Sequence, residues 1–514
     1  MTAKTIMVQG TASSVGKSIL TAALCRIFRQ DGLSVAPFKS QNMANNSYVT
    51  PDGGEIGRAQ ALQAAACGIE PSTDMNPVLL KPEADSRSQV VVNGKSRGSM
   101  PAREYYKRKM ELWGEVAAAL DRLRSSHDVV VIEGAGSPAE VNLRSSDIAN
   151  MRVALYARSP VLLVGDIDRG GVFASLLGTL ELLEPEERAL VRGLIINRFR
   201  GDRAVLEPLP LMIATRTGVP VLGIVPYITD LRLSEEDAAT LDGDSSATGA
   251  DTDRTLRVAV IRLPRISNFD DFDPLRRAGV RVDFVTGPAQ LEGAHAVIIP
   301  GTKSTIADLR WLKQKGLDDA VRTAAQRGAA VIGVCGGFQM LCERLEDPLG
   351  ADSGHPDTEP GLGLLPGATV FEREKTTRRV DVTLRPGPGL LEGASPVTGH
   401  GYEIHTGQTS GHAMPAAQIA AGPHGVVRAD GALSPDGRVM GTYVHGLFDT
   451  PAVLARLLGN IASLHGLPAP QVPDFSQDAE IDRLAAAVRD TIDMQAVYAI
   501  LGLTAGGRDA WAQR

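Results

Sequence analysis

The sequence is poor in cysteine and in aromatic residues, and it has no long apolar run. Its 514 residues include only four cysteines, too few for a disulfide framework in so long a chain. No apolar run reaches the roughly 18 residues needed to cross a bilayer. Aromatic residues make up 4%, so we expect cores built from aliphatic side chains. The start of the chain, Thr5–Gly10, has the pattern of a short strand and lacks the apolar stretch of a signal peptide, so we expect a cytoplasmic protein.

An excess of positive charge is also absent. Lys and Arg total 53 against 60 Asp and Glu, a formal net charge of −7. No basic face is implied, which makes duplex nucleic acid and anionic membranes poor candidate partners and leaves small molecules. Hydrophobic residues make up 43% and charged residues 22%, as in soluble globular proteins, and the length predicts two or three domains. The sequence carries no signal for the oligomeric state.

Two long stretches alternate short apolar runs with helical patterns. Apolar strands separated by helices predict parallel sheets covered on both faces, with ligands bound beyond the carboxyl ends of the strands. We therefore expect an α/β protein with two doubly wound domains, at residues 1–235 and 255–450. The expected strands are Thr5–Gln9, Val35–Phe38, Asp128–Glu133, Pro160–Asp166 and Gly193–Asn197 in the first domain, and Leu256–Arg262, Ala296–Pro300 and Ala330–Val334 in the second.

Two further segments have a different character. Residues 236–254 are small and acidic and nearly lack large apolar side chains, which predicts a flexible linker or a mobile loop. Residues 451–514 have the helical spacing of Leu, Ile, Ala and Val but no chemical motif, which predicts a C-terminal segment of packing helices.

A candidate phosphate-binding loop lies between the first expected strand and a helical pattern. In this context, backbone N–H groups and a helix N-terminus bind phosphate oxygens, Lys17 neutralises the β- and γ-phosphates, and the Ser18 hydroxyl binds Mg²⁺. The loop is one residue longer than the usual G-x₄-G-K-S/T form, and the alternative is an ordinary glycine turn before a helix. The predicted ATP-binding residues of this loop are Gly10, Thr11, Gly16, Lys17 and Ser18.

Three polar residues at the ends of other strands extend this prediction. Glu133 ends an apolar strand, where a carboxylate would provide a second contact to Mg²⁺. Asn197 would read a purine edge of ATP, and Lys39 would add positive charge over the γ-phosphate. The alternatives are a strand-end carboxylate, a plain turn and an exposed lysine, respectively.

A candidate nucleophile lies at a strand-to-helix turn in the C-terminal part of the chain. Cys335 lies in the run Gly333-Val-Cys-Gly-Gly337, and glycine on both sides of it permits a sharp turn into a helix. The N-terminus of a helix lowers the pKa of a thiol placed there. His445, at the end of another strand, is the candidate base. The backbone N–H groups of Gly301 and Gly336 would form an oxyanion hole.

Other residues compete for these roles. His400 and His405 are alternatives to His445, and we interpret them as substrate or structural contacts. Cys342 is the next candidate nucleophile, although its spacing from Cys335 is typical of a buried helix residue.

Together with several longer segments, these residues resemble the cobyric acid synthase family, the glutamine-dependent amidotransferases of cobalamin biosynthesis. The resemblance covers nearly the whole chain. The N-terminal part is also similar to dethiobiotin synthetase, whose longer P-loop has the same spacing, and the C-terminal part is similar to class I glutamine amidotransferases. The segments that carry the resemblance are Gln41–Val49, Asp74–Pro82, Glu133–Leu143, Asp166–Ser175, Leu263–Leu275 and Cys335–Leu341.

The resemblance implies a two-part reaction. Cys335 attacks the side-chain amide of glutamine and releases ammonia, while ATP phosphorylates a carboxylate that ammonia converts to an amide. The family does this at the b, d, e and g carboxylates of adenosylcobyrinic acid a,c-diamide. The polar stretch Ser40–Ser47 would clamp the carboxylates and amides of the corrin, and the alternative is an ordinary polar loop. The candidate contacts in it are Gln41, Asn42, Asn45 and Asn46.

One position departs from class I amidotransferases. Their triad has a Glu two residues after the His, where this sequence has Leu447. Amidotransferases of the cobalamin pathway also lack that Glu, so the group that orients His445 is left open. Two alternative functions remain. One is a sibling enzyme such as cobyrinic acid a,c-diamide synthase, and the other is a P-loop switch ATPase, which would have no reason to carry Cys335 and His445.

Overall fold

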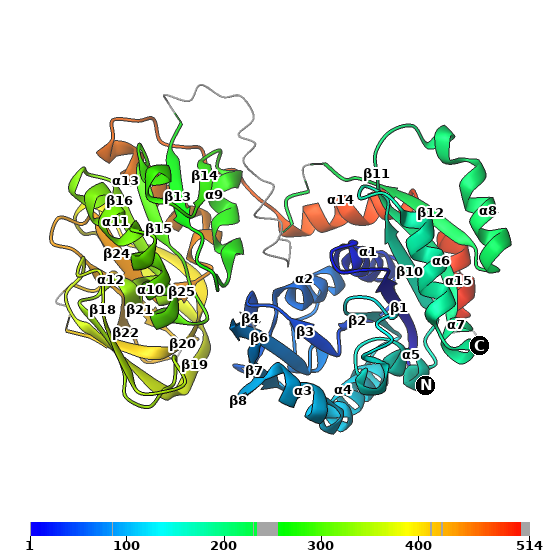
Figure 1. Ribbon diagram of the computed structural model, residues 1–514. Coiled ribbons are helices and arrows are strands. Elements are labelled where there is room, and N and C mark those ends of the chain that lie inside the picture. The colour runs from blue at the N-terminus through cyan, green and yellow to red at the C-terminus, as the bar shows by residue number, and fades with distance from the viewer. Residues whose placement is uncertain are drawn as a thin grey trace.

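The computed structural model describes residues 2–84, 86–229, 231–233, 255–411, 414–422 and 425–504. It contains two α/β bodies, drawn at the right and left of Figure 1, with a group of short strands between them. We call them the first half (residues 2–233 with the helices after residue 476) and the second half (residues 255–464). The sheets and their covering helices confirm the expected α/β fold class. The linker expected at 236–254 lies outside the described residues, which end at 233 before it and resume at 255 after it.

A six-stranded parallel sheet forms the centre of the first half. Its strands in sheet order are β12 (Val221–Pro226), β11 (Val191–Phe199), β10 (Val161–Asp166), β1 (Lys4–Gly10), β9 (Val129–Glu133) and β2 (Val35–Phe38). Every pairing between them is parallel. β9 is buried throughout, as expected for a central strand covered on both faces. The sequence did not predict β12, because this edge strand is only partly buried and ends in proline.

Helices on the two faces of this sheet build two separate cores. They are α1 (Lys17–Gln30), α2 (Arg58–Cys67), α3 (Ala102–Arg108), α4 (Trp113–Ser126), α5 (Met151–Ala157), α6 (Val172–Leu182), α7 (Pro185–Arg188) and α8 (Pro208–Thr217). On one face α1 buries Leu24, Ile27 and Phe28 completely. On the other face α4, α5, α6 and α8 bury their apolar sides. The carboxyl ends of the strands, where the predicted site residues lie, remain between these layers.

Short strands of the first half lie on the side that faces the second half (Figure 1). They form one sheet of β3 (Gln41–Met43), β6 (Val78–Ala84), β7 (Arg87–Val92) and β8 (Lys95–Pro101), and a hairpin of β4 (Ser47–Val49) and β5 (Glu55–Gly57). The sequence did not predict β3 and β4, because they are three residues long and carry amides and hydroxyls instead of alternating apolar side chains. They bring the polar stretch Ser40–Ser47 to the boundary between the halves.

The second half is built on a second, mainly parallel sheet. Its strands in sheet order are β14 (Arg281–Val285), β13 (Arg257–Ile261), β15 (Ala296–Ile299), β16 (Ala330–Val334), β24 (Val439–Thr442) and β23 (Ala432–Leu433), of which β23 alone is antiparallel to its neighbour. Its helices are α9 (Asp273–Arg277), α10 (Thr305–Gln314), α11 (Leu317–Gln326), α12 (Gly336–Leu341) and α13 (Pro451–Leu464).

A third sheet packs against this body and was not predicted. It contains β18 (Asp357–Pro360), β17 (Arg344–Asp347), β19 (Ala368–Leu384), β20 (Val397–Ser410) and β25 (Val444–His445), with β21 (Ala417–Ala420) and β22 (Arg428–Asp430) at one side. β19 and β20 form a long antiparallel hairpin. The charged run 372–379 hides the alternation of β19, so its sequence has the pattern of a polar loop.

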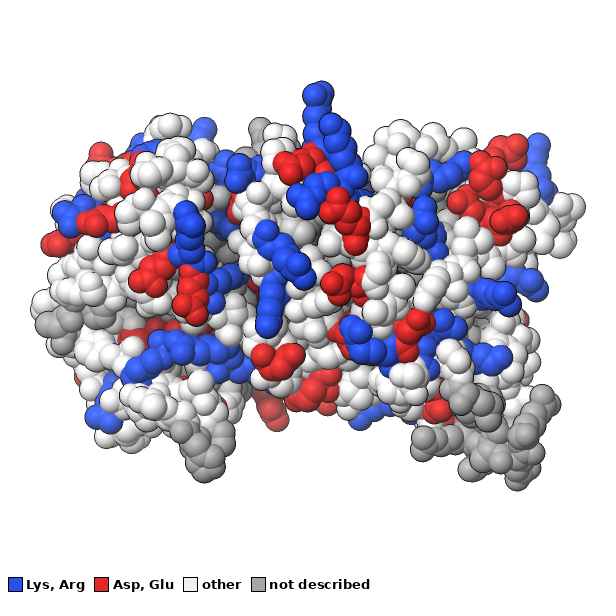
Figure 2. Space-filling view, turned by 90° about the horizontal axis from the view of Figure 1, so that it is seen from below, with Lys and Arg blue, Asp and Glu red and all other residues white. Residues whose placement is uncertain are grey.

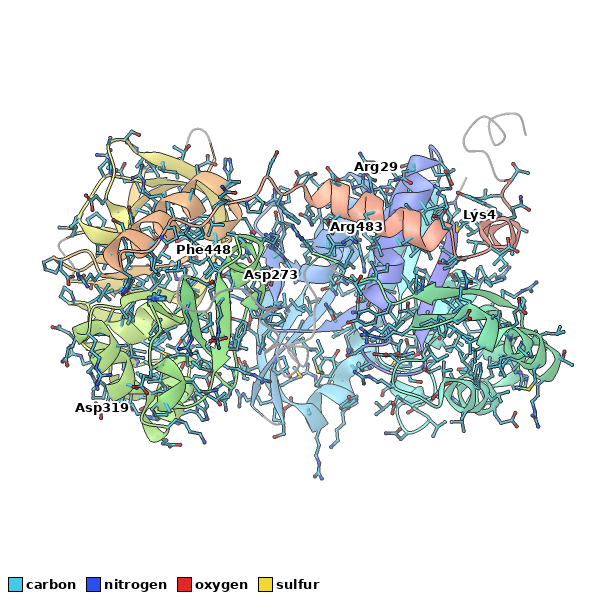
Figure 3. All side chains as sticks on the ribbon, turned by 90° about the horizontal axis from the view of Figure 1, so that it is seen from above. Lys4, Arg29, Asp273, Asp319, Phe448 and Arg483 are labelled. Atoms are coloured by element: carbon cyan, nitrogen blue, oxygen red, sulfur yellow. The ribbon has the colours of Figure 1, made fainter. Side chains whose placement is uncertain are left out.

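The helices after residue 450 divide between the two halves. α13 packs on the second half through Val453, Leu454 and Leu457. α14 (Gln477–Arg489) and α15 (Met494–Leu501) instead pack on α1 of the first half. Figure 3 shows Arg29, at the end of α1, and Arg483, on α14, on these neighbouring helices. The chain therefore returns to the first half after it has completed the second.

The surface carries charges of both signs. Figure 2 shows basic and acidic side chains interspersed over the face seen from below. Every helix among the described residues is too short or too polar to span a membrane.

Candidate active sites

The predicted phosphate loop joins β1 to α1 in the first half. Gly10 ends β1, and the helix begins at Lys17. Gly16, just before the helix, has a φ of 95°. A Cβ at this position would lie 2.2 Å from Nδ2 of Asn197, so only glycine fits both the backbone and the space. Asn197 donates to the carbonyl oxygen of Val15 at 2.8 Å and so supports the loop, while its expected contact with a purine stays a prediction.

The Lys17 side chain folds back onto this loop and also contacts the segment after β9. Its Nζ donates to the carbonyl oxygens of Ala12 at 2.8 Å and Gly136 at 3.1 Å. The N–H of Thr11 donates to the carbonyl of Val164 at 2.9 Å and so continues the sheet into the loop. These contacts hold an ammonium group and a helix N-terminus at one place, which is the arrangement that binds phosphate.

Glu133, at the end of β9, accepts hydrogen bonds from three polar side chains near the loop. Its Oε1 accepts hydrogen bonds from Ser18 and Lys39, each at 2.8 Å, and its Oε2 accepts one from Gln63 at 2.6 Å. Burial opposes ionisation of this carboxyl, but the Lys39 ammonium and the hydrogen bonds outweigh burial and hold the pKa of Glu133 below its usual value. Glu133 is therefore a carboxylate, and Lys39 is held beside it.

The donors in this loop fit Mg²⁺. Oγ of Ser18 and Oε1 of Glu133 lie 2.8 Å apart, and hydroxyl and carboxylate oxygens are the ligands that Mg²⁺ takes together with phosphate oxygens. Among the described residues, no cluster of three or more His, Cys, Asp or Glu could hold a metal, so phosphate oxygens would have to complete the coordination of Mg²⁺ here.

The polar stretch after β2 lies between the phosphate loop and the second half. Gln41 accepts from the hydroxyl of Tyr105 at 2.7 Å, and Asn42 donates to Oε1 of Gln60 at 3.0 Å. These two predicted substrate contacts thus have partners within the first half.

Three other residues of this stretch keep unused polar atoms. Oγ of Ser40, Oδ1 of Asn45 and Nδ2 of Asn46 are buried without a hydrogen-bond partner among the described residues. Oδ1 of Asn46 accepts from the backbone N–H of Phe269, in the second half, at 3.4 Å. Buried polar atoms without partners are costly, so they mark a place where a ligand's amides or carboxylates would be favoured.

In the second half, Cys335 occupies the turn between β16 and α12. Its φ is +51°, a strained conformation for a residue other than glycine and typical of a nucleophile at a sharp strand-to-helix turn, and its side chain is buried. A Cβ at Gly337 would lie 1.9 Å from the carbonyl oxygen of Ile299, and one at Gly336 would lie 2.8 Å from Cγ2 of Thr302. The glycines after Cys335 therefore allow the turn to pack directly on the segment that follows β15.

His445 lies beside this turn and is held by a carboxylate. Its Nδ1 is 2.7 Å from Oδ2 of Asp271, and Oδ1 of Asp271 accepts from the N–H of Gly446 at 2.9 Å. The ring of Tyr402 stacks on the imidazole with 5.6 Å between centroids. Both partners of the His–Asp pair are almost completely buried.

The pKa of His445 reflects these neighbours. Burial opposes protonation of the imidazole, but the Asp271 carboxylate and a hydrogen bond with Cys335 outweigh it and raise the pKa of His445 to about 10. His445 is therefore protonated at neutral pH, beside the sulfur of Cys335.

Asp271 is the group in contact with His445, where class I amidotransferases have a Glu at the position of Leu447. Leu447 is buried in the hydrophobic core of the second half. The group that orients His445 comes from the segment Leu263–Leu275, at the carboxyl end of β13, and sequence reasoning missed it. The signal was the adjacent carboxylates of Asp270 and Asp271, but Asp271 is 174 positions from His445 in the sequence, so no local pattern could pair the two.

A small cavity of about 50 Å³ opens onto Cys335 and His445. Gly301, predicted for the oxyanion hole, lies against the base, because a Cβ built on it would be 2.8 Å from Cε1 of His445. Ser47 and Lys81 of the first half also line the cavity. The site in the second half is therefore closed by side chains from the first.

The competing residues are engaged elsewhere. Burial raises the pKa of the Cys342 thiol to about 12, which makes it a poor nucleophile. His400 is exposed and pairs with Asp381 at 2.8 Å. His405 lines the cavity, but its ring nitrogens contact the carbonyl of Gly407 and the carboxylate of Glu403.

Comparison with known proteins gives each half a domain type. Residues 6–241 match the family model of the CobQ/CobB/MinD/ParA nucleotide binding domain, and residues 257–453 match that of the CobB/CobQ-like glutamine amidotransferase domain. A protein named cobyric acid synthase from Dehalococcoides mccartyi strain CBDB1 is 52% identical over 501 residues, which cover 97% of this chain and 99% of the relative. A protein of the same name from Sorangium cellulosum strain So ce56 is 52% identical over 523 residues, which cover 98% and 99%.

Proposed function

The chain belongs to the cobyric acid synthase family, and from this premise we propose that it converts carboxylates of a corrinoid into amides, with glutamine as the nitrogen source and ATP as the activating reagent. The substrate we propose is adenosylcobyrinic acid a,c-diamide, amidated at its b, d, e and g carboxylates to give adenosylcobyric acid. One observation carries the proposal. A phosphate loop with a buried carboxylate and a Cys–His–Asp arrangement occur in one chain, with the first half closing the site of the second.

In the second half, Cys335 would act as the nucleophile on glutamine. Its sulfur bonds to the amide carbon, and the negative charge on the carbonyl oxygen is stabilised by the backbone N–H groups of Gly301 and Gly336. His445, with a pKa of about 10, gives its proton to the leaving nitrogen as the C–N bond breaks, so ammonia departs. Water then hydrolyses the thioester, which releases glutamate and restores Cys335.

In the first half, the phosphate loop would bind the triphosphate of ATP. The backbone N–H groups at the start of α1 and the ammonium of Lys17 offset its charge. Ser18 and Glu133 would hold Mg²⁺, which supplies charge stabilisation for the transferring phosphoryl group. The corrinoid carboxylate oxygen bonds to the γ-phosphorus as the bond to the β,γ-bridging oxygen breaks, which gives an acyl phosphate and releases ADP. Ammonia then forms the C–N bond and phosphate leaves, whereas a bare carboxylate resists amines at neutral pH.

The polar stretch Ser40–Ser47 supports a substrate with many carboxylates and amides. Ser40, Asn45 and Asn46 present buried polar atoms without partners. The side-chain amides donate and accept hydrogen bonds, so the same groups suit a carboxylate before the reaction and an amide after it.

An isotope experiment tests this function. The purified protein is incubated with adenosylcobyrinic acid a,c-diamide, ATP, Mg²⁺ and glutamine labelled with ¹⁵N at the side-chain amide, and the product is examined by mass spectrometry. We expect four labelled nitrogens in the product. In a parallel incubation with cobyrinic acid in place of the diamide, incorporation at the a and c positions, with none into the diamide, would identify the sibling enzyme instead. ATP hydrolysis without incorporation into either corrinoid would refute both amidation reactions.

A further inference from the structure

The loop that carries Asp271 is held from the first half. It forms a short 3₁₀ turn, Phe269–Phe272, preceded by Asn268 in a left-handed conformation. Oδ1 of Asn268 accepts from the backbone N–H of Ser47 at 3.1 Å, and the N–H of Phe269 donates to Asn46 at 3.4 Å. The position of Asp271 therefore depends on the polar stretch of the first half.

Arg58, at the start of α2 in the first half, makes the strongest of these contacts. Its Nε is 2.7 Å from Oδ2 of Asp270, the residue next to Asp271. The Asp270 side chain is 1% exposed, and the described residues provide neither of its oxygens with a hydrogen bond apart from this ion pair. Burial, with Asp271 as a close like charge, raises the pKa of Asp270, while Arg58 opposes that rise. Arg58 is thus the cation that makes a buried carboxylate tolerable there.

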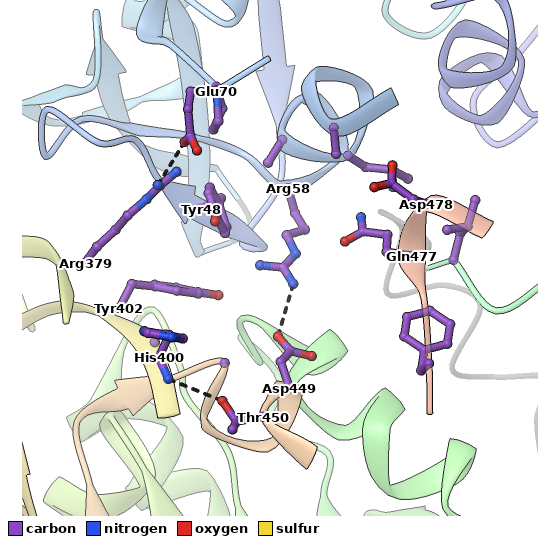
Figure 4. A pocket seen from close by; sticks show the side chains of 18 of the residues that line it. Tyr48, Arg58, Glu70, Arg379, His400, Tyr402, Asp449, Thr450, Gln477 and Asp478 are labelled. Carbon is purple, nitrogen blue, oxygen red and sulfur yellow. Dashed lines mark hydrogen bonds and ion pairs between the residues drawn. The ribbon is translucent and has the colours of Figure 1, made fainter. Parts of the chain in front are cut away.

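Arg58 also reaches the segment that carries His445. Its Nη2 is 3.7 Å from Oδ2 of Asp449, in the turn four residues after His445, and Figure 4 shows the guanidinium extending between the two halves toward that carboxylate. The guanidinium lies over the ring of Tyr48 at 5.1 Å, and Tyr48 packs on Tyr402, the ring stacked on His445. One arginine of the first half therefore contacts both segments that form the His–Asp pair.

We propose that Arg58 is a positioning residue for glutamine hydrolysis, supplied to the second half by the first. It holds the Asp271 loop and the turn after His445 in the relation that gives the 2.7 Å contact between Asp271 and His445. Docking of the halves then completes the base of the glutaminase site. This inference rests on the proposed function, because it assigns Arg58 to the glutamine reaction, although the residue belongs to the nucleotide-binding half.

The test separates the two reactions of the Arg58→Gln protein. Glutamine hydrolysis is measured as glutamate release, and the synthetase reaction is measured with ammonium as the nitrogen source. We expect kcat for glutamine hydrolysis to fall about ten- to a hundredfold, the range for loss of a partner that orients a functional side chain, with KM for glutamine nearly unchanged. Ammonia-dependent amidation should stay within about twofold of the wild type, which also shows that the variant is folded.

Two further variants sharpen the result. Arg379→Gln is the matched control, because Arg379 also pairs across the halves, with Glu70 at 2.9 Å, and also lies over the ring of Tyr48, at 5.2 Å, but has no ion pair with the Asp271 loop. It should keep both activities. Asp270→Asn in the Arg58→Gln background removes the unpaired buried charge, so it should recover part of the lost kcat.

The outcomes are distinguishable from failure of the proposed function. Unchanged glutamine hydrolysis in Arg58→Gln would overturn the inference. So would an equal loss of the ammonia-dependent reaction, which would assign Arg58 to the synthetase chemistry, or an equal loss in Arg379→Gln, which would reduce the effect to general docking. Absence of glutamine hydrolysis in the wild type would instead refute the proposed function.

Discussion

Replacement of Asp271 by Asn removes one charge from the proposed glutaminase site and little else. The two side chains have the same shape, and the amide oxygen of Asn can still accept the hydrogen bond from the N–H of Gly446. Asp271 lies behind His445 and does not line the cavity, so the binding of glutamine should be unaffected. The change therefore isolates the effect of the carboxylate on the imidazole.

The size of that effect follows from the pKa of His445. The rise from the usual 6.5 to about 10 corresponds to about 5 kcal/mol in favour of the protonated imidazole, supplied mainly by Asp271 and to a smaller extent by Cys335 against the opposing effect of burial. Without the carboxylate, burial remains and the pKa falls back toward or below its usual value. At pH 7.5 the protonated fraction of His445 then drops from nearly all to about a tenth or less.

We expect Asp271→Asn to lower kcat for glutamine hydrolysis by about 10³- to 10⁴-fold, the cost of the corresponding change in a hydrolase triad, because the imidazole loses both its proton and its orientation. The assay is glutamate release across pH 6 to 9, with ammonia-dependent amidation as the control for folding. Asp381→Asn is a matched control variant, because Asp381 pairs with His400 at 2.8 Å on the surface. Retention of glutamine hydrolysis within about threefold in Asp271→Asn would refute the reasoning. An exposed ion pair such as Asp381–His400 contributes little free energy, whereas removing one partner of a buried pair is costly.

Four further outcomes are expected. Cys335→Ser should abolish glutamine-dependent amidation and retain the ammonia-dependent reaction at high ammonium and alkaline pH, and loss of both in a folded protein would assign Cys335 to the synthetase chemistry. Lys17→Ala should lose amidation with either nitrogen source and keep glutamine hydrolysis; normal amidation would contradict the phosphate-loop assignment. Glu133→Gln should raise the Mg²⁺ concentration required for half-maximal amidation by about tenfold or more, and an unchanged titration would return Glu133 to a structural role. Because the folded pKa of His445 lies above 6.5, at about 10, its ion pair stabilises the folded protein fully below pH 6.5, and this contribution is lost as the pH rises through 10. Calorimetry between pH 7 and 10 should therefore show a falling unfolding temperature that Asp271→Asn flattens, and parallel curves for the two proteins would contradict the assigned ion pair.

Features made by contiguous residues could be predicted from the sequence. The phosphate loop needs only a strand, a glycine-containing turn and a helix in succession, and Gly10 to Ser18 supply all three. The turn at Cys335 likewise depends on its own neighbours, because Gly336 and Gly337 make the close approach possible. The central parallel strands were predictable because burial on both faces leaves them continuously apolar.

Features made by distant residues could not be predicted in the same way. Asp271 meets His445 only through the order of β13, β15, β16 and β24 in the second sheet, which no local pattern reveals. The hydrogen bond from the Asn197 amide to the Val15 carbonyl likewise joins residues far apart in the sequence, and the contact of Asn197 with a purine stays a prediction. The contacts of Arg58 depend on how the halves dock, and an arginine at a helix start has no distinguishing signal in the sequence.

The return of α14 and α15 to α1 makes the first half a discontinuous domain into which the second half is inserted. Leu484 and Val488 of α14 are completely buried in the core that also holds Phe28, and Arg489 pairs with Asp31 at the end of α1 at 2.9 Å. A fragment that stops at residue 235 would thus expose an apolar helix face, so the nucleotide-binding domain cannot be excised by cutting the chain once. The second half, by contrast, is connected to the rest at both of its ends, and its removal with a short bridge between residues 233 and 476 would leave the parent domain's core intact. Two connections also restrict how far the halves can separate, so the inserted amidotransferase domain remains beside the nucleotide-binding domain at a high effective concentration.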